Sequence, residues 1–311
     1  MASRKVLALF PGQGSQKVGM GKEFLEASET AKEYFDLADR ALGFSLTNIC
    51  CNGPADQLTR TDIAQPAILT VSTICYELAR ATLGGKFEVC AAAGHSLGEY
   101  SALVAAGVLA FEDAVQLVHK RGRYMQEAVP QGAGKMVAVL GKEQAEIEAA
   151  FEDLPGTIQI ANVNAPGQIV VAGEAAAVSA FTQKLAGSKV IELQVSAPFH
   201  CALMLPAAER LAVDLAAITM QPAQFPVYAN FSARPLTDPA EIRPSLKEQV
   251  CGRVRWVECL QNAVKNHAPD LAIEFGAGNV LTGLLKRIDS GVPRQNIESI
   301  GNLEKLKAAW A

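Results

Sequence analysis

The sequence predicts an α/β protein in which a smaller unit is inserted into a larger sheet domain. Three observations support this fold class. Short apolar runs alternate with helical patterns along most of the chain, as in sheets covered by helices. A strand-like run at 87–93 turns directly into a helical one. Residues 134–196 follow an order of elements that differs from the order before and after them.

Composition limits the classes of protein to consider. The chain has 311 residues, half of them hydrophobic, enough for one large domain or two modest ones. A net charge of -4 gives no footprint of non-specific nucleic-acid binding. The seven cysteines form no C-x-x-C pair, so neither a disulfide framework nor a metal site is indicated. The apolar run before Pro11 is too short for a signal peptide, and no later run could span a bilayer. We therefore expect a cytoplasmic protein without a membrane partner, and a monomer.

The first part of the chain predicts one strand at 6–10, which ends at a Pro-Gly-Gln-Gly turn. That turn resembles the start of a dinucleotide-binding loop, but Lys17 stands where the third glycine of G-x-G-x-x-G would be. No Walker pattern occurs either, so we reject nucleotide binding. The remaining elements of this part are helices at 20–42, 65–83, 97–106 and 111–129 and a strand at 87–93.

Residues 134–196 predict the order β-α-β-β-α-β, which is that of a ferredoxin-like unit. The strands are expected at 135–140, 158–163, 168–172 and 189–195, and the helices at 143–154 and 175–186. We expect a sheet domain made of residues 1–130 and 197–311, with a ferredoxin-like subdomain at 131–196 between them.

The last part of the chain reads as α/β again, which suggests that both flanks of the insertion form one larger sheet. Its predicted elements are a helix ending near 218, an extended stretch at 226–230, helices near 241–251, 255–267 and 280–288, strands at 271–275 and 297–300, and a C-terminal helix.

The strand-to-helix turn at 94–98 carries the strongest functional signal. Its sequence, Gly-His-Ser-Leu-Gly, matches the G-x-S-x-G pattern that lifts a serine out of a sheet. The first amides of the following helix favour negative charge in the same space. Ser96 is therefore a candidate nucleophile beside a site that stabilises an anion. The alternative is an ordinary strand-to-helix connection.

An arginine lies on the apolar face of the predicted helix at 111–129. Leu117, Val118 and Met125 form this face, and Arg121 falls three residues after Val118 and four before Met125. A charge among apolar neighbours needs an anionic partner, because an unpaired buried charge is costly. The alternatives are an internal salt bridge and a side chain that reaches solvent.

Of the four histidines, His200 is the best candidate for a general base. It lies where a short turn runs into a helix, and a helix start lowers the pKa of a histidine and favours the neutral, basic imidazole. His95 adjoins Ser96 inside the turn, and His119 and His267 lie among polar residues of helices. These three fit structural roles better.

Taken together, several motifs resemble the malonyl-coenzyme A:acyl carrier protein transacylase family of bacterial fatty acid synthesis over essentially the whole chain. The motifs are FPGQGSQ at 10–16, GHSLGEYSAL at 94–103, QEAVP at 126–130, NVNAPGQ at 162–168, FHCALM at 199–204 and LTGLLKRI at 281–288. The resemblance implies a hydrolase-like parallel-sheet core that bears a ferredoxin-like subdomain. It also implies malonyl-coenzyme A and acyl carrier protein as partners and no cofactor beyond these substrates.

The resemblance further implies roles for individual residues. Ser96 would accept the acyl group and His200 would be its base. Arg121 would bind the malonyl carboxylate, and the backbone amides of Gln13 and Leu97 would form the oxyanion hole.

The matching position for orienting the histidine is Gln249, which would act through its backbone carbonyl. This would explain why no triad carboxylate is evident; Asp153 lies between Ser96 and His200 in the sequence, on the predicted helix of the inserted unit. One departure concerns the run at 197–200, Ala-Pro-Phe-His, which differs from the His-Ala-Phe-His associated with malonyl preference in related polyketide domains.

Three alternatives to this function remain open. A serine esterase or thioesterase would use the same turn, but would need an acidic triad member and has no use for an inward arginine. A non-catalytic binding protein would not need Ser96, His200 and Arg121 together. A standalone acyltransferase of a polyketide pathway would use the same chemistry with another carrier.

Overall fold

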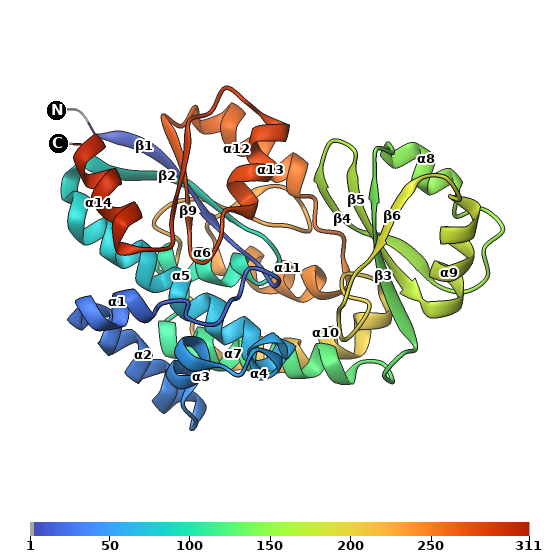
Figure 1. Cartoon of the computed structure of the whole chain (residues 1–311), viewed down its shortest axis with the longest axis horizontal. Helices are drawn as coiled ribbons and strands as arrows, with labels where there is room; N and C mark the ends of the chain where they lie inside the picture. Colours follow the sequence, from blue (N-terminus) through green and yellow to red (C-terminus); the bar gives the residue numbers. More distant parts are fainter. Residues whose placement is uncertain (1–2, 311) are drawn as a thin grey trace.

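The computed structural model describes residues 3–310 and contains two separate β-sheets (Figure 1). The larger sheet has the strand order β10-β9-β1-β2-β7-β8. Its first five strands are parallel, and β8 pairs with β7 in the antiparallel direction. The strands are β1 (Arg4–Phe10), β2 (Phe87–Gly94), β7 (Val227–Tyr228), β8 (Pro235–Leu236), β9 (Leu271–Phe275) and β10 (Arg294–Ile297).

Helices cover both faces of this sheet, which explains why β1 is apolar without alternation. Val6, Ala8 and Phe10 face one buried cluster, and Leu7 and Leu9 face the other, because successive side chains of a strand point to opposite faces. The helices are α1 (Lys22–Ala27), α2 (Glu29–Leu42), α3 (Leu46–Asn52), α4 (Ala55–Thr59), α5 (Thr61–Leu83), α6 (Gly98–Ala105), α7 (Phe111–Glu127), α10 (Leu205–Ala217), α11 (Pro239–Cys251), α12 (Trp256–His267), α13 (Val280–Ile288) and α14 (Ile300–Ala309). None of the helices in residues 3–310 combines the length and the apolar character needed to cross a membrane.

The smaller sheet is antiparallel and has the strand order β4-β5-β3-β6. With its two helices it forms the right-hand part of the molecule in Figure 1. In chain order the unit consists of β3 (Gly134–Leu140), α8 (Gln144–Ala149), β4 (Ile158–Ala165), β5 (Gln168–Glu174), α9 (Ala175–Lys184) and β6 (Lys189–Glu192). The predicted β-α-β-β-α-β order is confirmed, and the unit has an apolar cluster of its own.

The smaller unit is also joined to the larger one by contacts between distant residues. The backbone N–H of Val163 donates to the carbonyl of Val254, and the Val254 N–H donates to the carbonyl of Ala161, at 3.0 and 2.8 Å. Arg287 of α13 donates to Gln168 Oε1 and to the carbonyl of Pro166. The position of the smaller unit against the larger one is therefore fixed by hydrogen bonds as well as by the chain connections.

Several predicted boundaries in the larger unit are wrong. The helix predicted at 20–42 is two helices, because Ser28 adopts an extended backbone and its side chain accepts from Ala31 N to begin α2. The short helices α3 and α4 were not predicted. The strand predicted at 297–300 lies at Arg294–Ile297, since Ser299 already caps α14. Polar side chains hide this edge strand from an apolar pattern.

The smaller unit has shorter elements than predicted. The helix expected at 143–154 ends at Ala149, and the strand expected at 189–195 ends at Glu192. After β6 the chain runs without regular structure to His200. Asp153 therefore does not lie on a helix; it lies in a turn with a φ of 62°.

Candidate active site

A sharp turn between β2 and α6 places Ser96 at the end of the parallel strands. Its φ of 52° lies in the left-handed region, which is uncommon for residues with a side chain. Gly94 and Gly98 permit this turn: a Cβ on Gly94 would overlap the Gly98 backbone, and one on Gly98 would overlap the carbonyl oxygen of Phe10. The Ser96 N–H donates to Asn230 Oδ1 at 2.6 Å. The predicted strand-turn-helix geometry is therefore present.

His200 lies against this serine. Its Nε2 is 2.7 Å from Ser96 Oγ, and its Nδ1 is 2.9 Å from the backbone carbonyl oxygen of Gln249. A carbonyl oxygen can only accept, so Nδ1 carries the proton and Nε2 is left to accept from the serine hydroxyl. The serine and histidine of the sequence analysis thus form a hydrogen-bonded dyad with a main-chain acceptor behind it.

The reason for a neutral His200 differs from the one predicted. α10 begins only at Leu205, after a short 3-10 turn at Ala202–Met204, and His200 itself has a φ of 60°. It therefore does not lie in the first turn of a helix. Burial is the main cause that lowers its pKa, to about 3, and the charge of Arg121 adds to the effect. The imidazole is neutral because it is desolvated and lies near a cation.

Arg121 is buried on α7, as its place in the apolar pattern predicted, with 1% of its surface exposed. Its Nη1 donates to Gln65 Oε1 at 2.8 Å, and its Nη2 donates to Gln249 Oε1 at 3.0 Å and to Ser96 Oγ at 3.2 Å. The guanidinium also lies over the ring of Tyr100. Every one of these acceptors is neutral.

The partner of Arg121 is therefore not the internal carboxylate of a salt bridge. Among the ion pairs of residues 3–310, none includes Arg121, and its Nε has no hydrogen-bond partner. Burial lowers the pKa of Arg121, while Tyr100 and Glu99 oppose that shift. A buried cation with only neutral acceptors is suited to bind an anionic ligand.

Gln13 and Leu97 both line the hollow in front of Ser96. Gln13 belongs to the loop that follows β1, and its side-chain amide donates to Thr61 Oγ1 at 3.1 Å. Leu97 lies between Ser96 and the start of α6. Within residues 3–310, the backbone N–H of neither Gln13 nor Leu97 donates to another backbone group. Two backbone donors are thus available on this side of the serine.

The dyad opens into a cavity of about 280 Å³ between the two sheets. The larger sheet supplies Ser96 from the end of β2, where open α/β sheets place their ligand sites, and the smaller unit supplies Met136, Asn162 and Val170. A second hollow of about 210 Å³ shares Gln13, Gly14, His95 and Asn164 with it and continues to α13. The dyad lines only the first of these two adjoining hollows.

Some residues at this site were not found from the sequence. Gln65 and Asn230 hold Arg121 and the Ser96 backbone, respectively. Glu99 is buried behind the turn and accepts from Gln249. The signal that could have identified Gln65 is a single polar residue between apolar ones on α5; all residues from Thr61 to Tyr76 are buried.

Asp153 and His95 do not belong to the serine–histidine dyad. Asp153 lies in the smaller unit and does not line the cavity; the His200 Nδ1 bonds to the Gln249 carbonyl instead. His95 lies partly buried beside the serine, where its Nε2 is 2.8 Å from Asn164 Oδ1 and its ring meets Trp256 edge-on. The structural interpretation of His95 agrees with these contacts.

Several known proteins are similar to this chain in both sequence and fold. The family model for the acyl transferase domain matches residues 8–281. A malonyl CoA-acyl carrier protein transacylase of Bacillus subtilis (strain 168) is 43% identical over 296 residues, which cover 92% of this chain and 90% of that protein. This is similarity along nearly the whole length of both chains.

Solved structures give the same result. The crystal structure of malonyl-CoA:acyl carrier protein transacylase from Xanthomonas oryzae matches with a TM-score of 0.95 and 38% identity, covering 100% of both chains. A malonyl-transacylase in complex with its type II PKS acyl-carrier protein matches with a TM-score of 0.94 and 37% identity, covering 98% of this chain and 99% of that one. The α/β fold with its parallel-centred sheet and its second, antiparallel sheet is therefore shared with these proteins.

Proposed function

The chain belongs to the malonyl CoA-acyl carrier protein transacylase family of acyltransferases, and we propose that it transfers the malonyl group through a covalent intermediate on Ser96. The observation that carries this proposal is the convergence on one oxygen. Ser96 Oγ lies 2.7 Å from His200 Nε2 and 3.2 Å from Arg121 Nη2. A base and a site for a carboxylate therefore meet at the same nucleophile.

In the first half-reaction, His200 Nε2 takes the Ser96 proton while Oγ attacks the thioester carbonyl of malonyl-coenzyme A. The resulting oxyanion accepts from the backbone N–H groups of Gln13 and Leu97, and each such donor can contribute about 3 kcal/mol to the transition state. The carbon–sulfur bond then breaks, His200 returns the proton to the coenzyme A sulfur, and malonyl-serine remains.

The second half-reaction repeats these steps in reverse with another thiol. The phosphopantetheine thiol of acyl carrier protein gives its proton to His200 and attacks the malonyl-serine carbonyl. The serine oxygen leaves and recovers the proton from His200. Only malonyl-coenzyme A and the carrier thiol are needed, and the two adjoining hollows beside the dyad have room for a thin arm.

Arg121 binds the malonyl carboxylate in this proposal. Its planar fork matches both carboxylate oxygens, and it lacks an internal carboxylate among the described residues. Gln249 holds His200 in its reactive tautomer through the backbone carbonyl. This arrangement favours an acyltransferase over a hydrolase that depends on an acidic triad member.

We propose the following domain division. Residues 1–130 and 197–311 form a hydrolase-like core, and residues 131–196 form a ferredoxin-like subdomain. The antiparallel order β4-β5-β3-β6 and the β-α-β-β-α-β sequence of elements support the second assignment. The monomeric state and the cytoplasmic location stay predictions.

The alternative to a role in fatty acid chain elongation is a role in a polyketide pathway, and the two differ in the carrier protein that accepts the malonyl group. One structural neighbour is a malonyl-transacylase bound to a type II PKS acyl-carrier protein, and the same dyad would serve a polyketide carrier equally well. We place the chain in fatty acid synthesis because the malonyl CoA-acyl carrier protein transacylases among its relatives match over nine-tenths of its length.

Intact mass after incubation with malonyl-coenzyme A tests the proposed reaction. We expect a malonyl adduct that disappears when a fatty acid carrier protein is added, with the malonyl group then found on that carrier. Ser96→Ala should form no adduct, whereas Ser101→Ala, which removes a buried hydroxyl of α6 outside the cavity, should keep it. Release of free malonate with no transfer would instead indicate a thioesterase.

A further inference from the structure

Glu99 is a buried carboxylate that the mechanism above does not use. It lies in the first turn of α6 with 2% of its surface exposed. Its Oε2 accepts from the backbone N–H of Asn230 at 2.9 Å and from Gln249 Nε2 at 2.7 Å. Among residues 3–310 it forms no ion pair with a lysine, arginine or histidine. Burial of such a group lowers stability, so its position calls for a functional reason.

Gln249 connects Glu99 to the active site, because its side chain forms hydrogen bonds with both Glu99 and Arg121. Both hydrogens of its Nε2 are used, one toward Glu99 Oε2 and one toward the Ser96 carbonyl oxygen at 2.9 Å. Its Oε1 accepts from Arg121 Nη2 at 3.0 Å. A carbonyl can only accept, and so can Glu99 in its ionised form, which predominates above the pKa of about 7 that burial gives it. The amide nitrogen must therefore face them, and the amide oxygen must face Arg121.

The reversed amide would be unfavourable on both sides. Its oxygen would face the Glu99 and Ser96 oxygens, and its NH₂ group would face the guanidinium N–H groups of Arg121. Glu99 thus adds a second acceptor, beside the Ser96 carbonyl oxygen, that favours this orientation of the Gln249 amide. This arrangement also gives Arg121 a negative charge one side chain away, which opposes the effect of burial on the Arg121 pKa without occupying the guanidinium.

The same carboxylate also supports the serine turn. The Asn230 N–H that Glu99 holds belongs to the residue whose Oδ1 accepts from the Ser96 N–H, at 2.6 Å, and whose Nδ2 donates to the Gly94 carbonyl, at 2.7 Å. Glu99 therefore touches both residues that position the nucleophile and the arginine, although it does not itself reach the cavity.

We propose that Glu99 is a positioning residue for malonyl selection: it helps to hold the Gln249 amide so that the amide oxygen faces Arg121 and the guanidinium stays open to the substrate carboxylate. The inference rests on the proposed function, because it assumes that Arg121 binds that carboxylate. A direct Glu–Arg pair would neutralise the guanidinium, whereas the interposed amide orients it and leaves it free.

Glu99→Gln tests the proposal with almost no change of volume. An amide at this position can donate or accept, so it weakens the preference for one Gln249 orientation that Glu99 adds to that of the Ser96 carbonyl. It also removes the negative charge near Arg121. We expect kcat/KM for malonyl-coenzyme A to fall about ten- to a hundredfold, the range for losing one hydrogen bond to a charged group. The loss should appear mainly in KM, and kcat/KM for acetyl-coenzyme A should change much less.

The double variant Glu99→Gln/Gln249→Glu keeps one carboxylate and one amide in the buried pair and tests the proposal even if the single variant does not fold. It places the carboxylate directly against Arg121, so we expect malonyl selection to be lost as well. Glu274→Gln is the matched control, since Glu274 is a buried carboxylate that accepts from the Leu281 and Thr282 N–H groups and itself lines neither hollow.

The malonyl-to-acetyl ratio of kcat/KM decides the outcome. A ratio that falls in the Glu99 variants and holds in Glu274→Gln supports the proposal. An unchanged ratio in the folded single variant, or in the folded double variant, overturns it. Malonyl selection by Arg121 would then not depend on a carboxylate at position 99. The malonyl adduct of the unaltered protein is measured first; if it does not form on Ser96, the proposed function fails instead of this inference.

Discussion

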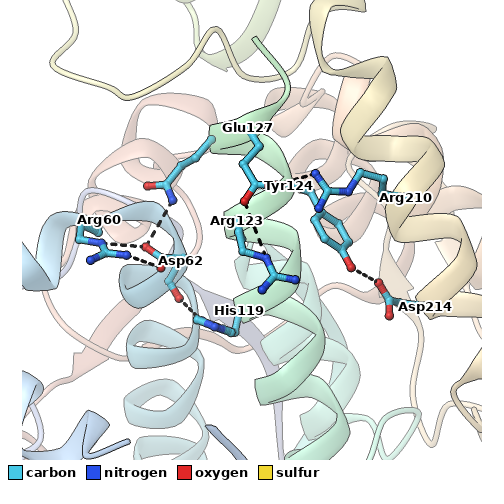
Figure 2. Close-up of polar contacts among 9 residues, drawn as sticks. Arg60, Asp62, His119, Arg123, Tyr124, Glu127, Arg210 and Asp214 are labelled. Atoms are coloured by element: carbon cyan, nitrogen blue, oxygen red, sulfur yellow. Dashed lines mark hydrogen bonds and ion pairs between the residues drawn. The ribbon is translucent and has the colours of Figure 1, made fainter. Parts of the chain in front are cut away.

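The basic side chains on the two sides of α7 have different kinds of partner. On the outer side, carboxylates pair with the basic residues: Glu127 lies 2.6 Å from Arg210 and 3.9 Å from Arg123 (Figure 2). On the inner side, Arg121 has only the amide oxygens of Gln65 and Gln249 and the Ser96 hydroxyl. The outer charges are satisfied within the protein, whereas the inner one is oriented and left without an internal carboxylate among the described residues.

A pair of histidines makes the same point. His119 Nδ1 is 2.7 Å from the Asp62 carbonyl oxygen (Figure 2), and His200 Nδ1 is 2.9 Å from that of Gln249. The Asp62 carbonyl is free because Pro66, four residues later inside α5, has no N–H to donate. His119 therefore completes the hydrogen bonds of a helix. The same bond to a carbonyl becomes part of a reactive dyad only where Nε2 meets Ser96.

The difference teaches that neither a buried arginine nor an oriented histidine identifies a site by itself. On the inner side of α7, by contrast, two such groups converge on one atom. His200 Nε2 and Arg121 Nη2 both form a hydrogen bond with Ser96 Oγ. The predictions below compare matched residues of the two regions, and they would fail if the inner region were only structural.

The largest contrast is expected between His200→Ala and His119→Ala. Removing the base should lower the transfer rate by about 10³-fold or more, as for other members of a nucleophile–base pair. Removing His119 should leave the transfer rate unchanged and cost about 1 kcal/mol of stability, for one hydrogen bond. Steady-state kinetics and thermal unfolding of the two variants measure this. Equal losses of activity would mean that His200 is also structural.

Arg121→Ala and Arg123→Ala give the next contrast. Removing one partner of a desolvated charge pair costs about 2–5 kcal/mol, or roughly thirty- to several-thousand-fold in kcat/KM for malonyl-coenzyme A. Acetyl-coenzyme A, whose methyl group has nothing to pair, should keep or gain rate in Arg121→Ala. Arg121→Lys should recover only part of the loss, because an ammonium lacks the planar fork.

Arg123 is the control because its side chain is half exposed and already lies near Glu127. Its replacement should leave the malonyl-to-acetyl ratio of specificity constants unchanged. If both substrates fall equally in a folded Arg121→Ala protein, the arginine has no role in choosing the substrate.

The sequence identified the parts of the inner region that depend on side-chain type and spacing. The Ser96 turn follows from its two glycines, and the burial of Arg121 follows from the helical period of α7. His200 was found for a wrong reason, since its low pKa comes from burial instead of a helix start. The fold class was likewise predicted from the order of strands and helices.

What could not be predicted depends on groups with no sequence signature. The acceptor of His200 is a backbone carbonyl, which every residue has, so only the resemblance could suggest Gln249. Asn230 comes beside Ser96 because β7 pairs with β2, a contact between segments more than a hundred residues apart. The edge strand β10 was predicted too far along the chain and the short helix α4 was missed, because their apolar patterns are too short to show a period.

A smaller effect is expected for the stability of the protein in mild acid. Burial holds the folded pKa of His200 at about 3, below the ordinary histidine value of 6.5. Between these values the unfolded chain binds a proton that the folded one does not, so stability falls as pH decreases. From pH 8 to pH 5 this contribution is about 2 kcal/mol.

Denaturant unfolding at both pH values, compared between the unaltered protein and His200→Gln, isolates this contribution. The comparison is needed because Glu99, whose pKa is raised by burial to about 7, acts in the opposite direction: its contribution grows as pH decreases from 7 toward 4.5. His200→Gln should lose less stability in acid than the unaltered protein does. Identical pH dependence in the two would show that His200 titrates normally.

The smallest effect is expected on the outer side, for Asp214→Asn. Asp214 lies 2.6 Å from Lys120 Nζ and accepts from the Tyr124 hydroxyl at 2.7 Å (Figure 2 shows the tyrosine contact). Burial would raise its pKa, but these hydrogen bonds and the Lys120 charge hold the pKa below its usual value. Because Lys120 is partly exposed, solvent weakens the pair, and the variant should lose less than about 1 kcal/mol of stability.

That small loss should shrink further as salt rises, because exposed charges are screened, and the malonyl-to-acetyl ratio should not change at all. Below the folded pKa of Asp214 the difference between the two proteins should disappear, since the carboxylate is then protonated and the pair is lost. Unfolding at low and high salt, with the substrate ratio measured on the same samples, tests both expectations. A changed ratio in Asp214→Asn would show that the outer charges of α7 act on the cavity, and the contrast between its two sides would not hold.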